Sequence, residues 1–490
     1  MASSAPCSDA SAPAVVPAAV PASQRLARAA HATRWCDLAG PVREQATDLF
    51  LDTLAVIAAG SVHSSVQPWI RALARESGCC TVLGLPATTP ELRGFTAATA
   101  TTAALLNGGA TTVLQWQDGH RMARGHPASH LVPALLALAE ERDSTAADLM
   151  SAFVAGYEVG ARVGVALGGL QALLHDGGTW ATLGVAAACA KLLGAGPEGI
   201  AQAIEAAASV APMPWRDTAS QGATVHHLYI GLGAAAAITT ARAAVAGLEA
   251  IPGTIEAFFG PRAGAQFHAS ALSSGIDADE RWSKYELLEA YFKWHPVCAH
   301  FSGLADALEQ IAGEFQRQRG RRPTHADIDC VDVALYGTAL LYNCAAPRTD
   351  LAARFSARAI VFASFDGAGL SGDALARAAS PEPAVRDWLA RVRVAHDPAL
   401  DAGYPAGRPA RVTLRLADGA TLTAAVTDVY GDTTKPMTAA DRAAKAQTAL
   451  VRRYGEGGAR AVRQAFARYL AGEPLAVLSA ALRAPAKVVG

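Results

Sequence analysis

Alanine-rich segments with helical periodicity fill the first half of the chain, from about residue 25 to residue 270. Residues 41–59 place leucine and isoleucine side chains on one broad face that ends before Gly60, and residues 145–167 begin at a Ser/Thr cap. Residues 183–193 and 231–248 are made mostly of alanine. Because small side chains let helices approach closely, we predict that these segments are the buried central helices of a large helical domain.

The pattern changes after about residue 275, where short stretches rich in β-branched residues occur. Residues 327–336 and 391–395 alternate in part, and residues 411–416 and 421–426 flank an Asp418-Gly419 turn that favours a hairpin. From Thr438 the helical periodicity returns. We therefore predict a mainly α protein in three parts: a disordered tail (residues 1–24), a large all-helical domain (residues 25–275 plus 437–490) and a smaller α+β domain (residues 276–436).

Composition excludes several classes of protein. The 490 residues carry 42 Lys+Arg against 43 Asp+Glu and are 51% hydrophobic, which argues against extensive disorder and against a nucleic-acid or anionic membrane surface. The eight cysteines are scattered without a CxxC pair, which fits a reducing compartment. The proline-interrupted N-terminus has no signal-peptide pattern. We expect a soluble cytoplasmic protein that binds neither nucleic acid nor membrane.

Five segments combine histidine, lysine or arginine with glycine, proline and polar residues, without a phosphate-binding loop, a GxSxG elbow or an HExxH motif. By residue type alone, each is also consistent with an ordinary loop, a helix start, a buried histidine or a snorkelling lysine. The segments are residues 114–130 (LQWQDGHRMARGHPASH), 175–184 (HDGGTWATLG), 224–233 (TVHHLYIGLG), 291–300 (YFKWHPVCAH) and 342–356 (YNCAAPRTDLAARFS).

Three of these segments have the chemistry of anion binding. Residues 175–184 form a glycine-rich turn that enters a helix, whose first N–H groups are free to bind an anion. Lys293 lies among aromatic residues, which suits a carboxylate in a partly dry site. Arg348 and Arg354 are possible two-pronged anion ligands.

The order and spacing of the five segments resemble the MmgE/PrpD family over about residues 40–460. Known members include 2-methylcitrate dehydratase, cis-aconitate decarboxylase and iminodisuccinate epimerase. The strongest part of the resemblance is Arg124-Gly125-His126-Pro127 followed by LVPALLALAE. Further support comes from His175 before TLGVAAACAKLLG, from residues 293–298 and from PRT…ARFS over residues 347–356.

The resemblance implies a large helical domain with an α+β lid, an active site between them, a small carboxylate substrate, and no organic cofactor or metal. His126 and His175 match the family's active-site histidines, and Tyr342 approximately matches a tyrosine on the lid side. His226 falls where decarboxylase-like members have lysine. The family's acidic stretch, which reads like Asp-Phe-Asp-Asp, is here Gln-Trp-Gln-Asp over residues 115–118, so only Asp118 keeps its acid.

The reaction that the resemblance implies removes or returns a proton at a carbon α to a carboxylate, or releases carbon dioxide there. Neutral histidines suit this proton transfer, so we assign His126 and His175 as the acid/base pair. We assign Asp118 to orienting a histidine or the substrate and Tyr342 to a hydrogen bond or proton. The expected substrate-binding residues are Lys293, Arg348, His226, Gln115 and His120.

Other functions stay open at this point. His120, His126 and His130 could bind the metal of a hydrolase, although Pro127 separates two of them and no further ligand is near. A catalytically impaired binding protein of the same fold is favoured by Gln115 and Gln117 and opposed by Asp118 and the retained histidines. Among family reactions, dehydration, decarboxylation and epimerisation remain alternatives.

The number of uncharged small-residue helices exceeds what one core needs, so we predict a homodimer that associates through the alanine-rich helices. Static light scattering at micromolar concentration should give twice the mass of one chain. The mass of a single chain would contradict this prediction.

Overall fold

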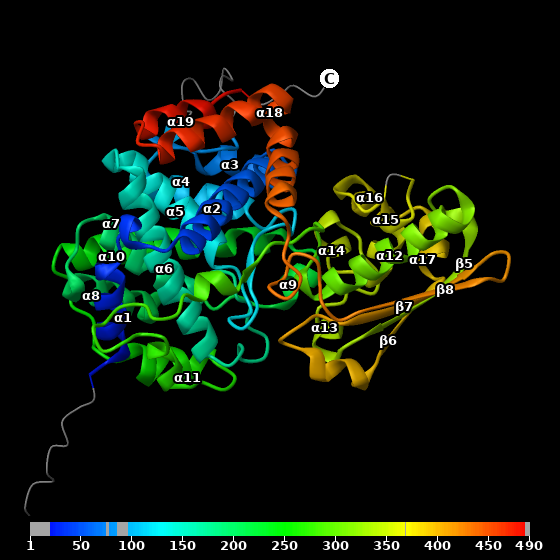
Figure 1. The fold of residues 1–490 in the computed structure, drawn as a ribbon, viewed down its shortest axis with the longest axis horizontal. Helices are drawn as coiled ribbons and strands as arrows, with labels where there is room; N and C mark the ends of the chain where they lie inside the picture. Colours follow the sequence, from blue (N-terminus) through cyan, green and yellow to red (C-terminus); the bar gives the residue numbers. More distant parts are fainter. Residues whose placement is uncertain (1–19, 75–77, 86–96, 368, 486–490) are drawn as a thin grey trace, which may run out of the picture.

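The computed structural model describes residues 20–74, 78–85, 97–367 and 369–485, and helices dominate it (Figure 1). The predicted mainly α fold class with a smaller α+β part is confirmed. One hydrophobic core unites buried residues between Ala22 and Phe292 with those between Met437 and Leu482. Its helices are α1 (Ala22–Ala32), α2 (Gly40–Ser61), α3 (Gln67–Leu73), α4 (Ala100–Ala110), α5 (Pro127–Arg142), α6 (Ala146–Ala166), α7 (Ala181–Leu192), α8 (Pro197–Val210), α10 (Leu228–Val245), α11 (Gly260–Ala263), α18 (Ala439–Leu470) and α19 (Leu475–Leu482).

Close packing explains the small residues of the central helices. Helix α7 contacts α5, α6, α8 and α10. A Cβ atom at Gly184 of α7 would lie 2.4 Å from the carbonyl oxygen of Gly156 and 2.7 Å from the Cα of Gly160, both in α6. The two helices can therefore cross at this distance only because these positions lack side chains.

A second core joins Ala219 with buried residues between Val297 and Val429. Its four-stranded sheet has the order β6-β5-β7-β8, in which β5 and β6 are parallel and the other neighbours antiparallel. Helix α12 packs on β7 and β8, and α15 contacts both α12 and β6. The elements are α9 (Asp217–Ser220), α12 (Ser302–Arg319), α13 (Gly337–Leu341), α14 (Asp350–Ala353), α15 (Ala357–Ser364), α16 (Gly372–Ala378), α17 (Pro383–Leu389), β5 (Ile328–Leu335), β6 (Val392–His396), β7 (Ala410–Leu416) and β8 (Thr421–Val426).

The hairpin between β7 and β8 forms at the predicted turn. Arg415 pairs with Thr421 across the turn, and Gly419 adopts a φ of +87°, which favours glycine. Two short strand pairs lie elsewhere: β1 (Cys80–Thr81) pairs with β2 (Ala97–Ala98), and β3 (Gly119–His120) pairs with β4 (Ala290–Tyr291). The second pair brings the histidine-rich loop beside residues 290–291.

The described part of the chain begins at residue 20 and ends at residue 485. Helix α1 begins at Ala22, inside the segment assigned to the tail. Residues 1–19 of the predicted disordered tail lie outside the described residues. At the other end, α18 and α19 pack on the first core, and Figure 1 shows α18 close to α2.

Within the described ranges, one helical segment, Thr224–Val245, is long and apolar enough to cross a membrane by length and composition. It consists of a short 3-10 turn followed by α10. Helix α10 packs against α4, α5, α7 and α8, and half of the apolar window is buried. Its place among these helices accounts for its apolar composition.

A buried ion pair ties the C-terminal helix α18 to α2 and to the histidine-rich loop. Lys445 Nζ lies 2.7 Å from Asp52 Oδ2 and 3.0 Å from the carbonyl oxygen of Trp116. Burial raises the pKa of Asp52, and the charge of Lys445 opposes that rise. Since Trp116 lies between Gln115 and Gln117, one ammonium group holds both the helix and the loop in place.

We expect Lys445→Met to lower the thermal unfolding midpoint by several degrees. The substitution leaves Asp52 buried without a partner, which costs roughly 3–5 kcal/mol in comparable pairs. Arg317→Met is the matched control, because Arg317 pairs with Glu314 on the surface of α12, where ion pairs contribute little. Scanning calorimetry of both variants measures the difference, and equal midpoints would contradict the stabilising role of Lys445.

Candidate active site

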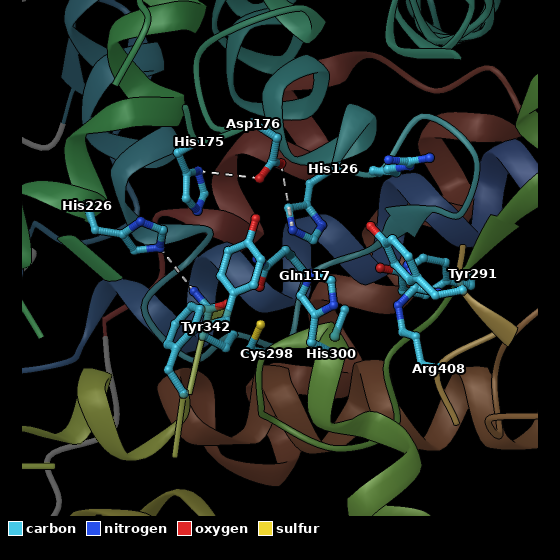
Figure 2. Close-up of a pocket in the computed structure, with 16 residues that line it drawn as sticks. Gln117, His126, His175, Asp176, His226, Tyr291, Cys298, His300, Tyr342 and Arg408 are labelled. Carbon is cyan, nitrogen blue, oxygen red and sulfur yellow. Dashed lines mark hydrogen bonds and ion pairs between the residues drawn. The ribbon is translucent and has the colours of Figure 1, made fainter. Parts of the chain in front are cut away.

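A cavity lies where the two cores meet, and Figure 2 shows its walls. The helical part contributes the loop of residues 115–126, the turn at residues 175–176 and His226. The other part contributes residues 298–300 and side chains from three later loops. The cavity is lined by Gln115, Gln117, Arg124, Gly125, His126, His175, Asp176, His226, Tyr291, Cys298, Ala299, His300, Tyr342, Phe355, Tyr404 and Arg408.

The backbone holds His126 in one orientation and one tautomer. Its Nδ1 lies 2.5 Å from the main-chain carbonyl oxygen of Asp118. A carbonyl oxygen only accepts hydrogen bonds, so Nδ1 carries the proton and the neutral ring has a lone pair on Nε2. Burial lowers the pKa of His126 to about 4, which keeps the ring neutral at pH 7. Nε2 is therefore available to accept a proton.

Asp118 positions His126 through its backbone and through the helix that follows. Its carboxylate accepts the N–H groups of Ala128 (3.0 Å) and Ser129 (3.1 Å) and the hydroxyl of Ser129 (2.8 Å). These are the first free N–H groups of α5, so Asp118 caps that helix. Its side chain is fully buried and is not part of the cavity wall.

His175 has the opposite tautomer. Its Nδ1 accepts a hydrogen bond from the backbone N–H of Gly177 at 2.9 Å, so the proton of the neutral ring lies on Nε2. Burial lowers the pKa of His175 as well. In their neutral forms, His126 thus has a free acceptor and His175 a free donor.

Asp176 lies between these two histidines (Figure 2). Its Oδ1 is 3.4 Å from His175 Nδ1, and its Oδ2 is 3.8 Å from His126 Nε2. Burial by itself would raise the pKa of Asp176, but His126, His175, His130 and a backbone hydrogen bond together lower it. Among the described residues Oδ2 has no hydrogen-bond partner. The carboxylate therefore stabilises a positive charge that arrives on either ring.

His226 contacts both His175 and a glutamine. Its ring packs edge-on against that of His175, with centroids 4.8 Å apart. The amide nitrogen of Gln115 donates to the carbonyl of Thr112 at 2.8 Å and lies 3.2 Å from His226 Nε2. His226 Nε2 therefore accepts, and its buried Nδ1 has a proton and no partner within the described chain. Burial lowers the pKa of His226 well below its usual value.

Two arginines supply positive charge to the cavity wall. Arg124 forms no ion pair with a carboxylate of the described residues, and its guanidinium lies 5.3 Å from the Tyr404 ring centre. Arg408 lies 4.8 Å from the Tyr291 ring centre, and its Nη1 donates to Asp432 Oδ2 at 3.5 Å. Both Nε atoms are buried without a partner in the described structure. Their unused donors suit the carboxylates of a ligand.

The second core adds an aromatic group to the wall. His300 stacks on Tyr342 with ring centroids 4.5 Å apart, and its Nδ1 lies 2.6 Å from the hydroxyl of Tyr336. Tyr336 in turn stacks on Tyr404 at 5.1 Å. Burial lowers the pKa of His300 to about 3. The rings on this side of the cavity are thus neutral and packed on one another, and Arg408 supplies the positive charge there.

The structure brings together five of the residues assigned from the sequence and leaves four outside the wall. Gln115, His126, His175, His226 and Tyr342 line the cavity, whereas Asp118, His120, Lys293 and Arg348 do not.

Among those four, Lys293 is buried and donates to the carbonyl of Val297 at 3.3 Å, and burial lowers its pKa to about 7. Arg348 is exposed on the surface. Arg354, the other arginine of that segment, is buried and bonds to Asp350 and to backbone carbonyls.

His120, His126 and His130 do not converge as metal ligands. His120 approaches the Glu286 carbonyl at 3.1 Å through Nε2 and accepts the Ala123 N–H through Nδ1. His130 donates from Nδ1 to the carbonyl of His126 and accepts the Gly178 N–H on Nε2. Both rings therefore have no nitrogen left for a metal. In the part of the chain that the structure describes, no group of three or more His, Cys, Asp or Glu is placed to bind one.

Sequence reasoning missed Asp176, Arg124, His300, Arg408 and Tyr404. Asp176 directly follows His175, and Arg124 and His300 stand in segments already singled out. Their position next to assigned residues was therefore the signal that could have identified them. Arg408 and Tyr404 lie in a loop before β7 that has no distinctive pattern. Only the three-dimensional fold places that loop on the cavity.

Comparison with known proteins finds two relatives that are named for cis-aconitate decarboxylase. Cis-aconitate decarboxylase-like protein oryM of Aspergillus oryzae is 34% identical over 184 residues, which cover 34% of this chain and 36% of that protein. Human cis-aconitate decarboxylase is 26% identical over 355 residues, which cover 70% of each chain. The chain therefore spans little more than a third of the fungal relative.

Two family models cover the greater part of the chain. The model of the MmgE/PrpD N-terminal domain matches residues 24–269, and that of the MmgE/PrpD C-terminal domain matches residues 295–469. Histidines of the N-terminal match face tyrosines of the C-terminal match across one cavity. Because both domains are matched in order over most of the chain, the protein belongs to the MmgE/PrpD family.

Proposed function

We propose that this chain is a lyase that acts on a small di- or tricarboxylate, by proton transfer or decarboxylation at a carbon next to a carboxylate. The observation that carries the proposal is the pair of opposite tautomers at His126 and His175, with Asp176 between them. His126 offers an acceptor nitrogen and His175 a donor N–H. Both rings line a cavity in which the Nε donors of Arg124 and Arg408 have no partner among the described residues.

In a dehydration, His126 Nε2 takes the proton from the carbon α to the carboxylate. The electron pair of that C–H bond delocalises into the carboxylate, where Arg124 and Arg408 stabilise the added negative charge. Asp176 stabilises the imidazolium that forms. The pair then forms the double bond as the β-hydroxyl leaves; the proton that His126 Nε2 has taken converts the leaving group to water, and the N–H of His175 Nε2 donates a hydrogen bond to that oxygen.

In a decarboxylation, the carbon–carboxylate bond breaks and its electron pair stays on the carbon. Carbon dioxide leaves, and an N–H or O–H group of the wall returns a proton to the carbon. His175 Nε2 and the Tyr342 hydroxyl are the candidates for this donor. The names of the two relatives favour this outcome, and the dehydration uses the same residues.

Two further alternatives use the same cavity. An epimerisation of a dicarboxylate needs only removal and return of the α proton, which His126 and His175 can share. An impaired binding protein would explain Gln115 and Gln117, but it gives no role to the half-buried Asp176, whose Oδ2 has no hydrogen-bond partner among the described residues and lies 3.8 Å from the acceptor nitrogen of His126.

Proton NMR in heavy water tests the proposal directly. The full-length protein is incubated with citrate, 2-methylcitrate, cis-aconitate and a set of four- to six-carbon dicarboxylates. Deuterium incorporation next to a carboxylate reports proton transfer, and new vinyl signals report loss of water or carbon dioxide. If no compound in the set is exchanged, dehydrated or decarboxylated, the proposed lyase activity is wrong.

We expect His126→Gln to lower the rate at which the reactive compound of the NMR test is converted about 10²–10⁴-fold, because the substitution removes the base. The glutamine amide can still donate to the Asp118 carbonyl, so the thermal midpoint should change little. His268→Gln is the control, since His268 is exposed and is not part of the cavity. Equal rates in the two variants would contradict the role of His126.

The pH dependence should follow Lys293 and His126. Burial lowers the pKa of Lys293 to about 7; this amine lies outside the cavity wall, but its charge acts on His126 at a distance, so the positive potential that favours a bound carboxylate is lost as the pH rises through 7. The pKa of His126 is about 4, so the base stays neutral down to that pH. We expect kcat/KM to be highest between these values and to fall above pH 7. Lys293→Arg, which stays charged, should lose this alkaline limb; a wild-type profile that is flat from pH 5 to 9 would contradict the assignment.

A further inference from the structure

The thiol of Cys298 lines the candidate active site, and no step that His126 and His175 carry out makes use of it. Figure 2 shows this thiol on the side of the second core, with the two histidines and Asp176 along the other side of the cavity. The backbone N–H of Cys298 donates to the carbonyl of Arg354 at 3.0 Å, which anchors the chain at this position. A ligand between the two walls therefore has the histidines on one side and the thiol on the other.

Two further residues of the wall point to a ligand in this cavity. Arg408 and Gln117 are only 4% and 1% exposed, and both line the cavity together with Cys298. Arg408 Nε and Gln117 Oε1 have no hydrogen-bond partner in the ranges that the structure describes. Because buried polar atoms are normally paired, a polar ligand would supply the missing contacts. Cys298 thus stands on the wall of a site that is built for a ligand.

A buried lysine lies close to this thiol. Lys293 Nζ donates to the carbonyl of Val297, the residue before Cys298, at 3.3 Å. Burial raises the pKa of Cys298 to about 11, and the backbone N–H of His300 and the charge of Lys293 oppose this rise. Burial lowers the pKa of Lys293 to about 7, and a negative charge on Cys298 opposes this more than any other nearby charge. The thiol is therefore protonated at pH 7, and an ammonium group is placed to stabilise the thiolate.

The two walls thus carry proton-transfer groups of opposite kind. His126 is a neutral base, and the carboxylate of Asp176 stabilises the positive charge that the ring gains with a proton. Cys298 is a neutral acid, and the ammonium of Lys293 stabilises the negative charge that remains when the thiol loses its proton. Neutral His175 is less suited to give up a proton, because its ring would become an anion 3.4 Å from Asp176.

We propose that Cys298 is a catalytic acid/base residue that returns a proton to the substrate carbon from the wall opposite His126, with Lys293 as the positioning residue that stabilises its thiolate. This inference rests on the proposed function, which supplies the carbanion that accepts the proton. It gives a role to Lys293, which is buried beside the cavity without being part of its wall.

In a decarboxylation, the bond from the carbon to the carboxylate breaks, and its electron pair stays on the carbon as carbon dioxide leaves. That pair forms a C–H bond with the thiol proton of Cys298, and the S–H electron pair stays on the sulfur as a thiolate. The thiolate takes a proton from solvent once the product has left. In an epimerisation, His126 removes the proton from one face and Cys298 adds a proton to the other, and both groups then exchange protons with solvent.

Alkylation with iodoacetate tests the position of the thiol without requiring turnover. Iodoacetate carries a carboxylate, so Arg124 and Arg408 should hold it beside Cys298. Peptide mapping by mass spectrometry of the folded, full-length protein measures the modification of Cys298 and of the exposed Cys36. We expect citrate and succinate to protect Cys298 and to leave the modification of Cys36 unchanged. A Cys298 thiol that reacts only after unfolding, or that neither acid protects, would overturn the proposal.

Substitutions of Cys298 test its catalytic role on the compound that reacts in the NMR test. Cys298→Ala should lower kcat about 10²–10⁴-fold and leave KM within about twofold, because it removes a proton donor and no carboxylate ligand. Cys298→Ser keeps a weaker donor and should recover part of the rate. Cys189→Ala is the matched control, since Cys189 is a buried cysteine of α7 that does not line the cavity. This control should keep the wild-type kcat.

A double substitution tests whether Lys293 acts through Cys298. Lys293→Met should lower kcat in the wild-type background and have little further effect on kcat once Cys298 is replaced by alanine, since no thiolate is left to stabilise. Two effects that simply multiply would overturn the pairing of Lys293 with Cys298. Wild-type kcat in Cys298→Ala, or an equal loss in Cys189→Ala, would overturn the role of the thiol while the proposed function stands. If citrate protects Cys298 but no compound of the NMR set reacts, the proposed function fails, and the acid/base role of Cys298 fails with it.

Discussion

The candidate site depends on one buried residue, Asp118, which acts twice. Its carboxylate satisfies the first N–H groups of α5, and its carbonyl fixes the proton of His126 on Nδ1. Helix capping and tautomer are thus set by the same residue, so the base cannot rotate without disturbing the helix that follows it. Lys445 secures the loop from the other side through the carbonyl of Trp116. The geometry of the candidate site is therefore built into the core and not into a surface loop.

Most of the secondary structure could be predicted because it depends on local patterns. The alanine-rich helices, the strands of residues 328–335 and 410–426 and the Asp-Gly turn follow directly from residue periodicity. The parallel pairing of β5 with β6 could not, since it joins strands far apart in sequence. In the site, the resemblance located His126 and His175, whereas Arg408 needed the fold. Arg348, chosen for its motif, is exposed, because nothing local distinguishes an arginine that faces a cavity from one that faces solvent.

Burial controls the charge of the site more than ion pairing does. The pKa values of His126, His175, His226 and His300 are all lowered, first of all by burial. A cluster of histidines that were charged would repel the arginines and one another. Kept neutral, the rings can exchange protons with a substrate at pH 7, and Asp176 is the carboxylate on the cavity wall that can compensate a proton once it has moved.

The departures from the family pattern form a consistent set when they are placed in the fold. The resemblance gives an acidic stretch like Asp-Phe-Asp-Asp where residues 115–118 read Gln-Trp-Gln-Asp, and a lysine in decarboxylase-like members where His226 stands. Gln115 and His226 contact each other, so two of these departures meet in one contact between neutral side chains. A charge on only one of the two would be unpaired in a buried site. With both partners neutral, the charged groups on the cavity wall are Arg124, Arg408 and Asp176. Under the proposed function, a substrate therefore meets neutral groups near His226, while its carboxylates face the two arginines.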